Sequence, residues 1–115
     1  MSKGSLEDSI SKVMIQWEKD YMGRGPTTAK TYIIRDMVVV SLKGMMSTAE
    51  QHLAKDMDGL ALIKKLRHLL VEQGRANLEE LLWTLTSAKV VSLHTDISTK
   101  TGERIFIFRM NRNLD

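Results

Sequence analysis

Two short segments of the chain collect residue types that can bind an anion. The first is a glycine-rich turn made of Gly23, Arg24, Gly25 and Pro26. Glycines let backbone amides face an anion, and an arginine can add a bidentate contact. The spacing is neither that of a P-loop nor that of a dinucleotide-binding loop. Two glycines and a proline are also the ordinary way to end a helix, so the turn alone supports either reading.

The second segment is a polar stretch nearer the C-terminus. Its candidate ligand-binding residues are His94, Asp96, Ser98, Thr99, Thr101 and Arg104. Hydroxyl groups and positive charge can hold a phosphate or a carboxylate, although an exposed hairpin tip has the same composition. A catalytic triad of Ser92, His94 and Asp96 is excluded. Same-face neighbours on a strand stand about 6.6–7 Å apart and point in parallel, whereas a nucleophile and its base must be in hydrogen-bond contact.

Metal, thiol and nucleic-acid chemistry lack their usual residues. The chain has no cysteine. Its three histidines, His52, His68 and His94, do not have the spacing of a ligand pair, and a His-x-Asp pair at residues 94 and 96 supplies only two ligands. We therefore predict no metal and no cofactor. The net charge of +3 is spread along the chain and no nucleic-acid-binding motif is present, so no specific nucleic-acid partner is predicted.

The glycine-rich turn follows a predicted helix. Ser5 is the expected N-cap, and apolar residues at steps of three and four run from Leu6 to Tyr21. The helix is expected to end near Met22, where the glycines and the only proline begin. Trp17 lies on the apolar stripe, which places it in the predicted core.

Two hairpins are predicted from β-branched and aromatic runs. Their strands cover residues 31–34, 37–42, 89–97 and 104–110. Arg35 and Asp36 form the expected tight turn of the first hairpin, with one bent strand as the alternative. The second hairpin turns at residues 98–103, where Gly102 suits a left-handed conformation. The polar residues 111–115 are expected to fray.

Two helices are predicted between the hairpins. Residues 47–50 form a capping box, which starts a short helix that is expected to reach about Met57. Asp58 is the expected cap of a long helix over residues 58–86. Gly74 is predicted to be its weak point, costing about 1 kcal/mol relative to alanine. Trp83 lies on an apolar stripe of this helix and is expected in the core.

The long helix carries more apolar side chains than one buried face requires. They are Leu60, Leu62, Ile63, Leu66, Leu69, Leu70 and Val71. Burial between the sheet and a second subunit would account for them, so we expect a homodimer. The alternative is burial within one chain, under the first helix.

These elements predict an α+β fold with the order α-β-β-α-α-β-β. The two hairpins would make a four-stranded, mainly antiparallel sheet, with the helices covering one face. A length of 115 residues fits a single domain over residues 1–115. No purely apolar run is longer than that of residues 37–40, whereas a membrane helix needs about 20 residues, and no secretory signal is evident. We expect a cytoplasmic location.

The chain resembles the MpsC-type family of bacterial proteins. The matching blocks are residues 21–26, 31–37, 42–44, 48–50, 53–54, 90–99 and 101–104. The resemblance implies a non-enzymatic accessory or regulatory module of a membrane cation or inorganic-carbon uptake system. Such a module would contact a membrane transport protein from the inner face of the membrane. A stand-alone sensor that binds a small anion or a nucleotide is the alternative, and an enzyme that uses Arg24, His94 and Asp96 is a weaker third.

Both candidate segments fall within the matching blocks, which favours a shared ligand or interface site. We therefore expect Arg24 and the hairpin from His94 to Arg104 to form one functional surface. Polar side chains on positioned loops are where binding usually resides. The alternative for Arg24 is an ion pair with an acidic neighbour.

Overall fold

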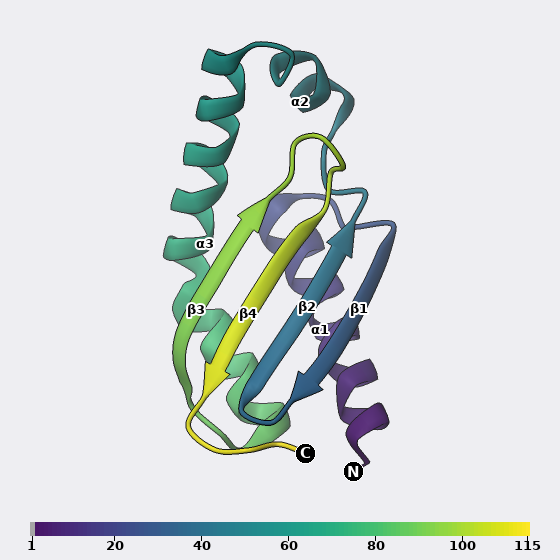
Figure 1. The fold of residues 1–115 in the computed structure, drawn as a ribbon, viewed down its shortest axis with the longest axis vertical. Coiled ribbons are helices and arrows are strands. Elements are labelled where there is room, and N and C mark those ends of the chain that lie inside the picture. The colour runs from purple at the N-terminus through teal and green to yellow at the C-terminus, as the bar shows by residue number, and fades with distance from the viewer. Residues whose placement is uncertain (1) are drawn as a thin grey trace.

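The computed structural model describes residues 2–115 as an α+β fold with the predicted order of elements (Figure 1). The elements are α1 (Lys3–Met22), β1 (Thr28–Ile34), β2 (Met37–Lys43), α2 (Thr48–Leu53), α3 (Met57–Thr86), β3 (Val90–Ile97) and β4 (Arg104–Met110). The strands form one sheet in the order β1-β2-β4-β3, and every neighbouring pair is antiparallel. The prediction of a four-stranded antiparallel sheet from two hairpins is confirmed.

The turn of the first hairpin is tied to the C-terminus. Ile34 pairs with Met37, so Arg35 and Asp36 form a two-residue turn, with Arg35 in the left-handed region at φ 57°. The carbonyl of Arg35 accepts a hydrogen bond from the amide of Leu114, and its amide donates to the carboxylate of Asp115. The prediction that residues 111–115 fray is therefore wrong, because these bonds hold the tail against the turn.

The sheet has one covered face and one open face. Side chains alternate between the faces, and the inner set packs under α1 and α3 (Figure 1). The inner residues of the sheet include Ile33, Val38, Val40, Leu42, Ile97, Phe106 and Phe108. From α1, Ile10, Met14 and Trp17 meet them as predicted. The helices thus cover one face and leave the other uncovered.

Helix boundaries differ from the predicted ones by a few residues. Ser2, not Ser5, is the N-cap of α1, since its hydroxyl accepts from the amide of Ser5. Asp56, not Asp58, caps α3 through the amide of Gly59. The capping box at residues 47–50 is confirmed, although α2 ends earlier than expected.

Two residues of α3 behave differently from their prediction. Gly74 is buried where α3 crosses α1, and a Cβ there would lie 2.7 Å from Cζ2 of Trp17. It is a point of close helix contact and not a weak point. Trp83 is 47% exposed, so its predicted place in the core is wrong. Its neighbours Leu78 and Leu82 face the sheet instead, which turns Trp83 toward solvent.

The N-terminal half of α3 extends past the end of the sheet toward α2 (Figure 1). Leu62, Leu66 and Leu69 on this part are 50–57% exposed. Ile63 and Val71 face inward and are buried. The broad apolar surface read from the sequence is thus divided into a buried line and an exposed line.

Candidate functional site

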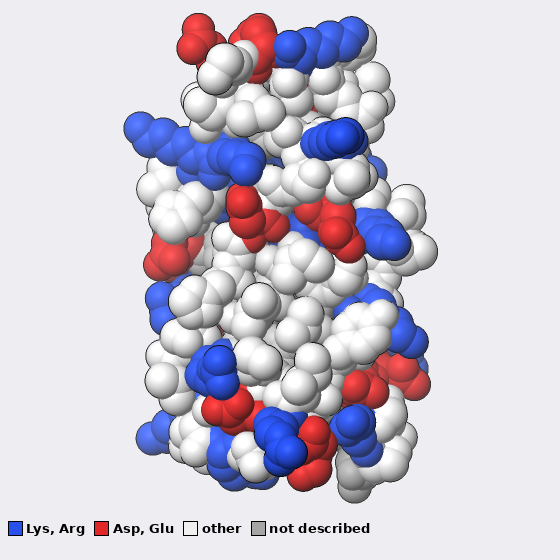
Figure 2. All heavy atoms as spheres, viewed as in Figure 1, with Lys and Arg blue, Asp and Glu red and all other residues white. Residues whose placement is uncertain are grey.

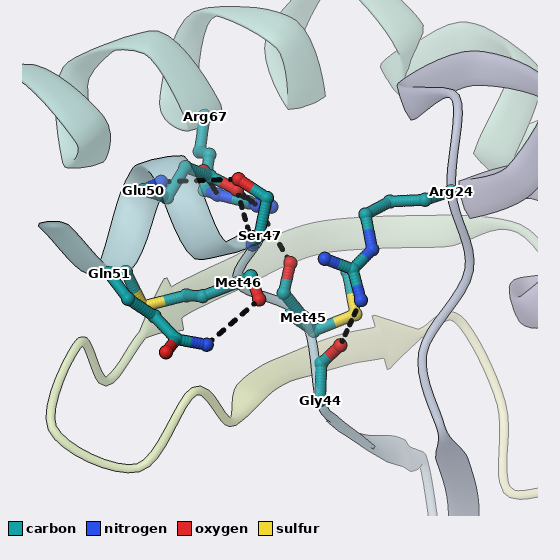
Figure 3. Close-up of polar contacts among 8 residues, drawn as sticks. All are labelled: Arg24, Gly44, Met45, Met46, Ser47, Glu50, Gln51 and Arg67. Atoms are coloured by element: carbon teal, nitrogen blue, oxygen red, sulfur yellow. Dashed lines mark hydrogen bonds and ion pairs between the residues drawn. The ribbon is translucent and has the colours of Figure 1, made fainter. Parts of the chain in front are cut away.

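The two segments singled out in the sequence contact consecutive residues of the β2–α2 loop. The guanidinium of Arg24 donates to the carbonyl of Gly44 over 3.3 Å (Figure 3). The carbonyl of Gly102, in the tip of the second hairpin, accepts from the amide of Met45 over 3.1 Å. Arg24 and the hairpin tip are therefore joined through this loop.

Local backbone geometry places Arg24 at the surface. Gly23 adopts φ 86°, and its amide donates to the carbonyl of Lys19, which ends α1 in a left-handed cap. Arg24 is the first residue beyond this cap and is exposed. Gly44 has φ 74°, and a Cβ there would overlap the side chain of Thr27. The positive φ angles of Gly23 and Gly44 therefore favour glycine at both positions.

A nearly buried ion pair fixes the other end of the loop. Arg67 on α3 donates from Nε and Nη2 to the two carboxylate oxygens of Glu50, over 2.9 and 2.8 Å (Figure 3). Its Nη2 also donates to the carbonyl of Met45 over 2.9 Å. Burial alone would raise the pKa of Glu50, but hydrogen bonds from Arg67 and Ser47 outweigh it and lower that pKa.

A small cavity opens beside these groups. Its volume is about 260 Å³, and it is lined by Met22, Arg24, Met45, Ser47, Glu50, Leu66, Arg67 and Leu70. Glu50 and Arg67 neutralise each other, so Arg24 gives the cavity a net positive charge. Leu66 belongs both to this cavity and to the exposed apolar line on α3. The glycine-rich turn is therefore continuous with the apolar surface of α3.

The hairpin tip borders a second, larger cavity of about 540 Å³. It is lined by Gly44, Met46, Gln51, Ala54, Lys55, Thr99, Lys100, Thr101 and Gly102. Thr99 and Thr101 thus lie at a cavity, as expected of binding residues. Lys55 and Lys100 add positive charge, which suits an anion. Ser98 instead shapes the turn, because its hydroxyl accepts from the amide of Thr101.

The residues of β3 lie away from both cavities. His94 and Asp96 are exposed on the open face of the sheet. Asp96 forms an ion pair with Lys64 at 3.4 Å and also accepts from the amide of Ile97. Neither residue lines the cavity at Arg24 or the cavity at the hairpin tip.

Comparison with known proteins identifies the family. A model described as "Na+-translocating membrane potential-generating system (MpsC)" matches residues 2–112. The chain belongs to the MpsC family. It is 46% identical over 114 residues to the uncharacterized protein YbcI of Bacillus subtilis (strain 168), across 99% of this chain and 92% of the relative. It is 28% identical over 111 residues to the uncharacterized protein YrhF of the same strain, across 92% and 88% respectively. No solved structure matches it.

Arg104 of this MpsC-family chain is buried, contrary to its predicted place on an exposed hairpin tip. The alternation of β4 puts it on the same face as Phe106 and Phe108. Its guanidinium lies 5.4 Å from the ring centroid of Phe106 and donates from Nη1 to the hydroxyl of Thr95 over 2.8 Å. Arg104 therefore belongs to the core and not to a surface binding site.

Sequence reading missed a buried acid that faces Arg104. Glu18 on α1 is fully buried, and neither of its carboxylate oxygens has a hydrogen-bond partner among residues 2–115. Burial raises its pKa from 4.5 to about 7. The positive charges of Arg104 and Arg67 lower this pKa, but burial outweighs them. The available signal was spacing, because Ile10, Met14 and Glu18 follow one another at steps of four along the buried line of the helix.

Among residues 2–115, no group of three or more His, Asp or Glu side chains is arranged to hold a metal ion. None of the helices in this range is long and apolar enough to cross a membrane.

Proposed function

We propose that this MpsC-family chain is a non-enzymatic accessory or regulatory module of a bacterial membrane system for cation or inorganic-carbon uptake. The observation that carries the proposal is the exposed line of Leu62, Leu66 and Leu69 on the projecting half of α3. The description of the family as part of a Na+-translocating, membrane potential-generating system supports the choice of a membrane system as the partner.

The exposed line has the geometry of a helix that docks into a groove. Residues spaced by three or four positions lie on one side of a helix, so Leu62, Leu66 and Leu69 form one stripe. Leu53 and Met57 extend the apolar surface toward α2. Burying a leucine that is otherwise in water contributes about 1.5–3 kcal/mol, so three half-exposed leucines supply a substantial part of a specific contact. The partner surface would lie at the inner face of the membrane.

Arg24 adds a polar component to this surface. It lines the same cavity as Leu66, and its only described hydrogen bond is to a carbonyl oxygen. A carboxylate on the partner can therefore take a bidentate bond from it. The proposed docking site thus combines the apolar stripe of α3 with the exposed arginine of the glycine-rich turn.

The experiment uses a deletion strain of a bacterium that encodes this chain. Na+-dependent membrane potential is measured with a potential-sensitive dye after complementation with the wild type, Leu66→Glu or Val91→Glu. Val91 is an exposed apolar residue on β3 and serves as the matched control. We expect the wild type and Val91→Glu to restore the potential and Leu66→Glu to fail. Full restoration by Leu66→Glu would contradict the proposal.

Site-specific crosslinking identifies the partner. A photoreactive amino acid at position 66 is expected to capture an integral transport protein in intact cells, whereas the same group at position 91 does not. Mass spectrometry of the crosslinked product gives its identity. Equal yields from the two positions would show that the α3 stripe does not direct the contact.

A small-anion or nucleotide sensor is the second candidate, and the cavity at the hairpin tip favours it. Lys55 and Lys100 line that cavity together with Thr99 and Thr101. A ligand present at 100 times its dissociation constant stabilises the native state by about 2.7 kcal/mol. A melting-temperature rise with phosphate, bicarbonate or a nucleotide, lost in Lys55→Ala/Lys100→Ala, would support the sensor. It would displace the accessory role if Leu66→Glu also kept full activity in cells.

A further inference from the structure

The open face of the sheet has an apolar centre. Its outward residues include Met37 and Val39 on β2 and Ile105 and Ile107 on β4, all partly exposed. Tyr32 and Ile34 on the edge strand β1 are about half exposed, at 48% and 51%. Figure 2 shows this face, with uncharged side chains over its middle and charged groups around them. None of the helices formed by residues 2–115 covers this surface (Figure 1).

The charges at its border are arranged by the strand register. Lys30, Ser41, Ile105 and Asp96 form one row across the four strands, from β1 to β3. Lys30 and Asp96 thus stand at opposite ends of the same row, with opposite charges. The next row toward the β1–β2 turn contains Tyr32, Val39, Ile107 and His94 in the same order.

We propose that a second copy of this chain docks on the open face. The two copies are related by a two-fold axis that runs parallel to the strands, midway between the two sheets and level with the boundary of β2 and β4. Such an axis places β1 of one copy over β3 of the other and keeps each row opposite itself. Lys30 then faces Asp96 of the second copy, and Asp96 faces its Lys30. Tyr32 covers His94 of the second copy, and Val39 meets its Ile107. These two rows are complementary to themselves, as a two-fold interface requires.

A two-fold axis perpendicular to the strands does not give this match. It would place the row of Lys30 over the row of Ile34, Met37, Arg109 and Ser92. Lys30 would then meet Ile34, and Asp96 would meet Ser92, so neither charge would face an opposite charge. The charge pattern therefore selects the axis parallel to the strands.

The proposed packing agrees with the dimensions of stacked sheets. Aligned sheets keep their strand directions within about 30° of each other. The edge strands lie one and a half strand spacings, or roughly 7 Å, from the axis. A 30° rotation shifts residues there by about 4 Å, which a flexible lysine side chain can span. Lys30 therefore reaches Asp96 of the second copy despite the twist of the sheets.

The existing partner of Asp96 leaves it available. In its ion pair with Lys64, the side chain of Asp96 is 76% exposed and that of Lys64 is 40% exposed. Such pairs are weak because solvent screens them. The proposal also gives a role to His94 and Asp96, which lie away from both cavities. It uses a different surface from the α3 stripe and does not rest on the proposed function.

The mass of the protein in solution tests this assignment. Light scattering from the micromolar to the millimolar range is expected to show about twice the chain mass of 13.1 kDa. Ile107→Lys places a charge at the centre of the face and is expected to give a monomer with an unchanged circular dichroism spectrum. Leu66→Glu is the matched control on α3 and is expected to remain a dimer.

A charge exchange at the rim tests the same interface without the Ile107→Lys substitution. Lys30→Glu turns both rim attractions into repulsions and is expected to weaken dimerisation about tenfold. Lys30→Glu/Asp96→Lys restores the opposite charges and is expected to recover the wild-type dissociation constant. A wild-type monomer over the whole range would overturn the proposal. So would a dimer broken by Leu66→Glu and kept by Ile107→Lys, or a double variant no tighter than the single one.

Discussion

The carboxylate of Glu18 and the guanidinium of Arg104 interact electrostatically inside the core without completing their hydrogen bonds. Both side chains are buried, and the two oxygens of Glu18 and Nε of Arg104 have no hydrogen-bond partner in the part of the chain that the structure describes. The residues come from α1 and β4, on the covered side of the sheet. A buried carboxylate without hydrogen bonds is disfavoured in its charged form. Proton binding by Glu18 is therefore coupled to folding.

The first prediction is that Glu18 makes the protein less stable as the pH rises toward neutrality. Burial raises its pKa from 4.5 to about 7, so the native state holds this proton more tightly than the unfolded state. Its contribution is fully present below pH 4.5 and is lost as the pH rises through about 7. The loss amounts to about 3 kcal/mol. Urea denaturation of the wild type and Glu18→Gln measures it.

The comparison with Glu18→Gln isolates this group from the other titrating residues. Glutamine has the same shape and stays neutral, so the variant is expected to gain stability relative to the wild type between pH 5 and pH 8. If the two curves of unfolding free energy against pH run parallel, Glu18 does not titrate in this window and the prediction fails.

The second prediction concerns the helix crossing at Gly74. Alanine in a helix is ordinarily about 1 kcal/mol better than glycine. At this position the added methyl group would lie 2.7 Å from Trp17 and 3.1 Å from Tyr21, whose rings stack on each other. Overpacking of this kind costs about 1–3 kcal/mol. We expect Gly74→Ala to lower the free energy of unfolding, measured by urea denaturation.

Gly4 provides the matched control for this substitution. It also lies in a helix, but a Cβ there has no atom of the described residues within 4 Å. Gly4→Ala is therefore expected to leave the protein equally stable or slightly more stable. A stabilising effect of Gly74→Ala as large as the helix-propensity gain would show that the two rings move aside freely.

Local signals in the sequence predicted most of the fold. The capping box at residues 47–50 and the β-branched run at 37–42 depend on neighbouring residues, and both appear in the structure. The polar composition of the turn predicts an exposed Arg104, whereas the residue is buried. The strand alternation, set by Phe106 and Phe108, already places Arg104 inside.

Long-range packing accounts for the features that the sequence did not reveal. Helix propensity alone makes Gly74 a weak position, because the close contact with Trp17 is visible only in the folded chain. Trp83 has the hydrophobicity of a core residue, but α3 meets the sheet through Leu78 and Leu82 and leaves the indole exposed. The link between Arg24 and the hairpin tip depends on the β2–α2 loop, which carries no residue type that indicates binding.

The third prediction concerns that link. Arg24 is exposed and donates only to the carbonyl of Gly44 among its described hydrogen bonds, so Arg24→Ala is expected to leave the melting temperature nearly unchanged. Amide chemical shifts are expected to move at Met45 and, through its hydrogen bond, at Gly102. His94 lies on the open face and serves as the internal reference. Shifts confined to residues 23–26 would disprove the coupling.

The fourth prediction separates the ion pair of Glu50 from its capping role. Glu50→Gln keeps a side-chain oxygen for the Ser47 amide but removes the charge that Arg67 contacts through two nitrogens. Arg67 is buried, so its charge loses its compensation, and we expect a loss of about 2–3 kcal/mol at pH 7. Ser47→Ala removes the hydroxyl cap alone and is expected to cost about 1 kcal/mol.

The pH dependence of this loss identifies its cause. Burial opposes ionisation of Glu50, but the bonds from Arg67 and Ser47 prevail and the pKa of Glu50 is lowered. Its contribution is therefore present above the ordinary pKa of 4.5 and disappears as the pH falls through the lowered pKa. Urea denaturation is expected to show the wild type and Glu50→Gln converging in acid, while the Ser47→Ala difference persists. A Glu50→Gln loss that is the same at every pH would mean that packing, and not the charge pair with Arg67, holds the β2–α2 loop in place.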